Sequence, residues 1–62
     1  MLETFETNRP DKIFDTIERE GKWIKTITEN KYSEQVWYHR GREYHFDFIG
    51  KLCTKVQFEA LQ

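Results

Sequence analysis

After Gly21 the spacing of the hydrophobic residues changes from a helical period to a period of two, and this change constrains the fold more than any other feature. Before it, Ile13, Phe14 and Ile17 form one apolar stripe of the kind that an amphipathic helix presents. After it, apolar and polar residues alternate in short segments that glycines interrupt. The sequence therefore predicts one helix followed by antiparallel strands.

The predicted helix covers residues 9–20. Asn8 and Asp11 lie three residues apart, as in a capping box, and Pro10 falls in the first turn. Gly21 stands where a left-handed C-cap residue is expected. Because three turns of helix are unstable alone in water, the apolar stripe must be buried against the strands.

A hairpin is expected around Gly41, between strands over residues 32–39 and 42–49. In a two-residue loop Arg40 and Gly41 would both need positive φ, which arginine disfavours. A three-residue loop with a bulge needs positive φ only at the glycine, so we expect that loop. Its register pairs Val36 with Tyr44.

This register gathers one aromatic face on the hairpin. The same three-residue loop with a bulge, placed at Gly50, sets Phe46 beside Val56 and Tyr44 beside Phe58 in a last strand over residues 54–60. Two turns thus agree on which side of the sheet faces inward. The residues expected on that face of the hairpin are Val36, Tyr38, Tyr44, Phe46 and Phe48.

The expected fold class is α+β, with the N-terminal helix packed on an antiparallel meander of three or four strands. Trp23 and Ile27 are expected to join the covered face from the first strand. An alternative makes residues 54–61 a short C-terminal helix, which gives the order α-β-β-β-α. Residues 1–62 form one domain, and residues 1–7 are expected to be a frayed lead-in.

Composition narrows the classes of function. The formal net charge is −1, so the chain lacks the overall basic excess of a typical duplex-binding protein. Cys53 is the only cysteine, and no Cys/His spacing predicts a metal site or a cofactor. No apolar run approaches the roughly 20 residues of a membrane span. The N-terminal segment is polar, so we expect a cytoplasmic protein with no membrane association.

The hairpin tip is the clearest candidate for nucleic-acid contact. His39, Arg40 and Arg42 surround the turn glycine, and guanidinium groups bind phosphates well. The simpler interpretation is a solvated turn. A third hypothesis is a small histidine-dependent ribonuclease that uses His39 or His45, but no nucleophile or cleft is predicted beside either, and no catalytic residue is assigned.

The second face of the sheet is the candidate surface for protein contact. In the expected register it carries Trp37, His45, Ile49 and Glu43, and a tryptophan among polar neighbours is typical of an interface anchor. Open sheet edges also favour self-pairing as a homodimer. In size and composition the chain resembles small accessory proteins of phages and mobile elements. The leading hypothesis is therefore a non-enzymatic module that binds a protein, either itself or a host factor.

Overall fold

The computed structural model describes residues 1–61, which form one helix and five strands. The elements in chain order are β1 (Glu3–Thr4), α1 (Pro10–Glu20), β2 (Lys22–Glu29), β3 (Tyr32–His39), β4 (Arg42–Ile49) and β5 (Leu52–Ala60).

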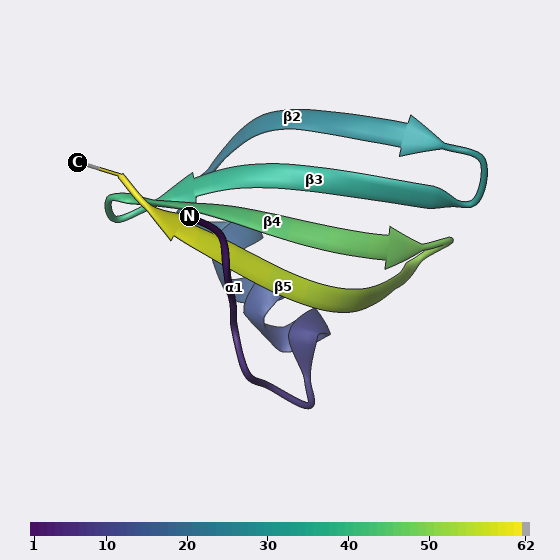
Figure 1. Cartoon of the computed structure of the whole chain (residues 1–62), viewed down its shortest axis with the longest axis horizontal. Helices are drawn as coiled ribbons and strands as arrows, with labels where there is room; N and C mark the ends of the chain where they lie inside the picture. Colours follow the sequence, from purple (N-terminus) through teal and green to yellow (C-terminus); the bar gives the residue numbers. More distant parts are fainter. Residues whose placement is uncertain (62) are drawn as a thin grey trace.

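The five strands form one antiparallel sheet in the order β1-β5-β4-β3-β2, and α1 lies across one face of it (Figure 1). This confirms the predicted α+β meander, with one more strand than expected. The additional strand comes from the N-terminal segment, where Phe5 N–H also donates to the carbonyl of Val56 at 2.9 Å. The alternative C-terminal helix is wrong, because residues 52–60 are extended and paired with β4.

The helix bounds were predicted almost correctly, but both of its expected caps are wrong. Arg9 is the N-cap residue, and no side chain caps the helix. Instead, the Arg9 guanidinium donates to both carboxylate oxygens of Asp11 at 3.2–3.3 Å, which lowers the pKa of that carboxyl group. Gly21 is extended, with φ −100°, and is not left-handed. A Cβ there would lie 2.5 Å from the carbonyl oxygen of Tyr38, so close approach of the backbone requires the glycine.

The core lies between α1 and the strands β4 and β5. Phe14 is central: its ring meets those of Phe46 and Phe48 edge-on, with 5.0 Å between centroids in both pairs, and that of Trp37 at 6.0 Å. Edge-to-face rings add to the stabilisation that burial alone provides. The buried members of this cluster are Ile17, Tyr44, Phe46, Phe48, Cys53 and Val56.

The predicted pairs Phe46–Val56 and Tyr44–Phe58 between β4 and β5 are confirmed. The loop at Gly50 nevertheless has two residues and not three, since Ile49 lies opposite Leu52, and a bulge in β5 at residue 54 restores the predicted register.

The predicted pairing of β3 with β4 is wrong by one residue. Tyr44 does lie opposite Phe58; however, its partner on β3 is Trp37 and not Val36. The loop between β3 and β4 has only two residues, Arg40 and Gly41, which both adopt positive φ, of 49° and 79°. Turns of this left-handed type match the twist of the strands, and that match outweighs the strain on arginine.

A shift of one residue turns every side chain of β3 to the other face. Trp37 therefore packs against Phe14 on the helix side, whereas Tyr38 and Val36 lie on the opposite side. Val36 is nevertheless fully buried there. The expectation that Trp37 lies on the second face is thus wrong, and so is the placement of Val36 and Tyr38 on the covered face.

Strand β2 contributes less to the core than expected. A bulge between Trp23 and Lys25 changes its register, so that Trp23 faces the helix side and Ile27 the opposite side. Their exposed fractions are 58% and 49%, so neither is a core residue, in contrast to the prediction. All eight residues of β2 are exposed, and this strand forms the free edge of the sheet (Figure 1).

Candidate functional site

The sheet face opposite α1, called here the open face, carries a row of exposed apolar side chains. Tyr32, Ile49 and Leu52 are direct cross-strand neighbours on β3, β4 and β5. They are 62%, 45% and 66% exposed. Ile27 on β2 lies on the same face near this row, since it is opposite Glu34, two residues from Tyr32. These four residues, Ile27, Tyr32, Ile49 and Leu52, are called the apolar patch.

A shallow hollow of about 230 Å³ lies beside the apolar patch at the β2 side. Its lining combines Ile27 and Tyr32 with three acidic residues, Glu29, Glu34 and Asp47. Contiguous apolar surface with a polar rim is the arrangement that marks protein-contact sites. The hollow is open and shallow, so it fits a side chain of a partner better than an enclosed small molecule.

Next to the apolar patch, a charged network crosses the same face. His45 Nδ1 lies 3.3 Å from a carboxylate oxygen of Glu34, and its Nε2 lies 3.4 Å from one of Glu43. Lys55 pairs with Asp47 at 3.5 Å. A histidine between two carboxylates is the part of this face closest to acid–base chemistry. The direct cross-strand neighbours of His45 are Val36 and Gln57, and neither is a nucleophile.

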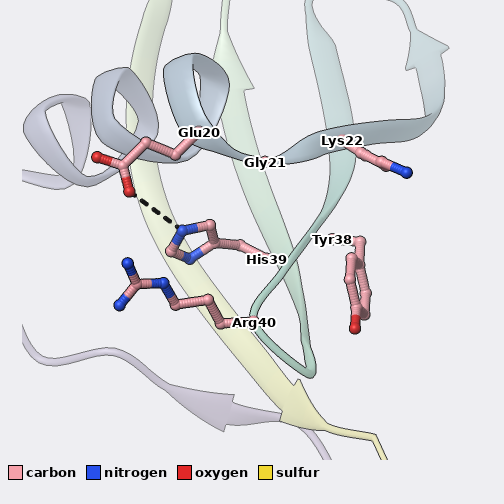
Figure 2. A pocket seen from close by; sticks show the side chains of 6 residues that line it. All are labelled: Glu20, Gly21, Lys22, Tyr38, His39 and Arg40. Atoms are coloured by element: carbon pink, nitrogen blue, oxygen red, sulfur yellow. Dashed lines mark hydrogen bonds and ion pairs between the residues drawn. The ribbon is translucent and has the colours of Figure 1, made fainter.

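His39 and Arg42 are direct cross-strand partners at the hairpin tip, but the side chains of the three tip residues do not converge on one point. His39 is directed toward the helix end, where its Nε2 lies 3.2 Å from Glu20 Oε1 (Figure 2). The Arg42 guanidinium lies over the Phe58 ring, 4.8 Å from its centroid. Neither arginine forms an ion pair within residues 1–61, so Arg40 is the residue of the tip with neither an ion pair nor a ring contact in this part of the chain.

Figure 2 shows the shallow hollow at this end of the sheet, which has a volume of about 230 Å³. Glu20, His39 and Arg40 lie on one side of the strand, and Lys22 and Tyr38 lie on the other. The carboxylate of Glu20 lies beside His39, where its negative charge would repel a phosphate. Charge at the tip is therefore mixed, which weakens the prediction of a phosphate clamp.

Of the four residues predicted for protein contact, Ile49, His45 and Glu43 lie on the open face, and Trp37 does not. The sequence reasoning missed Tyr32 and Leu52. A signal for them was present, because apolar residues flank two of the turns directly, and two-residue loops would have aligned them across the strands. The three-residue loop assumed at Gly41 obscured the alignment of Tyr32 with Ile49, and the one assumed at Gly50 obscured that of Ile49 with Leu52.

Comparison with known proteins assigns no family to the chain. Comparison with protein-family models, with curated proteins and with solved structures found no match to the chain. Within residues 1–61, no helix is long and apolar enough to cross a membrane. Nor does this part of the chain contain a group of three or more histidine, cysteine or acidic side chains arranged to hold a metal ion.

Proposed function

We propose that the chain is a small non-enzymatic binding module that contacts a protein partner through the open face of its sheet. The observation that carries this proposal is the apolar patch, in which three exposed side chains from three strands are adjacent. An exposed tyrosine, with exposed isoleucine and leucine side chains on the next two strands, supplies the apolar centre that an interface needs. The acidic residues around the patch would form its polar rim, and they favour a partner with basic residues around an apolar centre.

A matched pair of variants tests this function. Tyr32→Thr with Leu52→Thr removes two patch residues while keeping residues suited to strands. The control is Trp23→Thr, which removes an equally exposed aromatic residue on the other face of β2. Each tagged chain is cross-linked in lysate of its native host after nuclease treatment, and the captured proteins are quantified.

We expect the unmodified chain and the control to capture the same defined protein. The amount of that protein captured by the patch variant should be lower by about tenfold or more, since two interface anchors each contribute on the order of 1–2 kcal/mol. Equal capture by the patch variant would refute the proposal. Capture that disappears with nuclease, and falls in Arg40→Ala, would instead favour the nucleic-acid hypothesis. Cleavage of RNA that His45→Ala abolishes would favour the ribonuclease hypothesis.

A further inference from the structure

Strand β2 is the longest unpaired edge within residues 1–61, since all eight of its residues are free on the outer side. At the opposite edge β1 and Phe5 cover β5 from Val56 to Phe58 and leave residues 52–55 uncovered. An exposed edge presents unpaired N–H and C=O groups that can pair with another strand. Natural sheets often block such edges with bulges and charged residues. The bulge of β2 lies at Trp23–Lys25, so it leaves residues 25–29 regular and available for pairing.

The turn that follows β2 determines which backbone groups face this edge. Glu29 and Tyr32 close the two-residue loop, so they exchange the hydrogen bonds of the hairpin. Hydrogen-bonded and non-hydrogen-bonded positions alternate along an antiparallel strand. Ile27 and Lys25 therefore direct their backbone groups toward β3, whereas Thr26 and Thr28 direct theirs toward the free edge.

Two copies of β2 can pair antiparallel about a two-fold axis only if edge-facing positions oppose each other. With the axis at Ile27, Thr26 lies opposite Thr28 of the partner subunit. Lys25 then lies opposite Glu29 of the partner subunit, and by symmetry this favourable charge pair occurs twice.

The neighbouring registers lack this complementarity. An axis at Thr26 places Lys25 opposite the partner's Ile27. An axis at Lys25 places the two copies of this lysine opposite each other, and an axis at Thr28 places Lys25 opposite Lys31 of the partner subunit. Like charges directly opposite one another destabilise a strand pair, so only one register brings unlike charges together.

We infer that this chain forms a homodimer by pairing β2 with β2 of a second copy about a two-fold axis at Ile27. The two sheets become one continuous sheet with both helices on the same side. The apolar patches of the two subunits also become continuous, because Ile27 belongs to the patch and lies opposite Ile27 of the partner subunit at the axis. With five paired residues per strand the interface is small, so the dissociation constant is expected in the micromolar range, roughly 1–100 µM.

Charge reversal tests the register. Sedimentation equilibrium of the full chain from ~1 to ~200 µM should show a monomer–dimer equilibrium for the unmodified protein. Lys25→Glu alone and Glu29→Lys alone should each weaken dimerisation about tenfold or more, because both symmetric pairs become repulsive. The double exchange Lys25→Glu with Glu29→Lys restores both pairs and should restore the dimer. Circular dichroism confirms that each variant is folded.

A cysteine cross-link gives an independent readout. In a Cys53→Ala background, Ile27→Cys should form an intermolecular disulfide, because a non-hydrogen-bonded pair brings the two Cα atoms to about 4.5 Å. Thr26→Cys, one residue away, should cross-link far less. A monomer throughout the concentration range, a double exchange that stays monomeric, or preferential cross-linking at position 26 would overturn the inference. None of these results depends on whether the apolar patch binds a partner.

Discussion

Substitution of Gly21 gives a direct test of how the helix is joined to the sheet. The ideal Cβ of an alanine there would lie 2.5 Å from the carbonyl oxygen of Tyr38 and 2.8 Å from that of Ile17. Both contacts are with backbone, so relief requires the helix end or β3 to move by about 0.5 Å. Overpacking of this kind costs roughly 1–3 kcal/mol. A chain of this length has about 3–9 kcal/mol of stability in total, so the loss is a large fraction of it.

The matched control is Gly41, where a Cβ would meet nothing within 4 Å but φ is +79°. Gly41→Ala should cost about 1–2 kcal/mol through backbone strain alone. Asparagine tolerates this left-handed conformation, so Gly41→Asn should recover most of that loss. Gly21→Asn should recover nothing at position 21, because its cost arises from the Cβ itself.

Thermal and urea unfolding followed by circular dichroism measures these differences. Each kcal/mol corresponds to roughly 4–8 °C in the melting temperature of a domain of this size. Gly21→Ala should therefore melt about 5–20 °C below the unmodified chain. Equal stability of Gly21→Ala and the unmodified chain, or a rescue by Gly21→Asn, would refute the close approach of Tyr38 and Gly21 on which the helix–sheet junction depends.

Two further predictions concern the core. Phe14→Ala should destabilise the fold by about 3–5 kcal/mol, measured by urea unfolding, because it removes three ring contacts at once. The control, Tyr32→Ala on the open face, should change stability by less than about 1 kcal/mol. Burial raises the pKa of the Cys53 thiol to about 11, from an ordinary value of 9.0. At about pH 8.5 its alkylation by iodoacetamide should be about a hundredfold slower than in the urea-unfolded chain, and similar rates in the two states would contradict the buried position. Because the folded state disfavours the thiolate, this group should also reduce stability progressively as the pH rises from 9 toward 11, and Cys53→Ala should lack that part of the decline.

The extent to which this fold was predictable differs from strand to strand. The alternation of Val56 and Phe58 with polar residues predicted the inward face of β5 and its pairs with Phe46 and Tyr44. The two-residue loop at Gly50 and the bulge that compensates for it were not predicted. For β3 the outcome depended on the loop at Arg40. The strain of positive φ on arginine, about 1–2 kcal/mol, favours a three-residue loop. The better match of a two-residue loop to the twist of the strands favours the shorter loop, and it outweighs that strain. The observed register accepts that strain and packs the Trp37 ring against Phe14.

The candidate site was harder to predict than the core because it depends on the register of every strand. Ile49, His45 and Glu43 were placed correctly on the open face, since the inward face of β4 was correct. Trp37 was misplaced by the shift of a single residue. The hydrogen-bond contact of His39 with Glu20 could not be foreseen either, because it joins residues 19 positions apart through the packing of the helix end on β3.

The two proposed surfaces are adjacent at Ile27, and this adjacency has a physical consequence for binding. If two chains pair along β2, their apolar patches form one stripe related by a two-fold axis, and a two-fold symmetric partner could engage both halves at once. Such a bivalent contact strengthens binding by raising the effective concentration of the second half, without any new contact in either half. The Lys25→Glu variant separates these contributions, since it leaves Tyr32, Ile49 and Leu52 intact. It should retain the contact of each single chain and lose the additional affinity that pairing supplies.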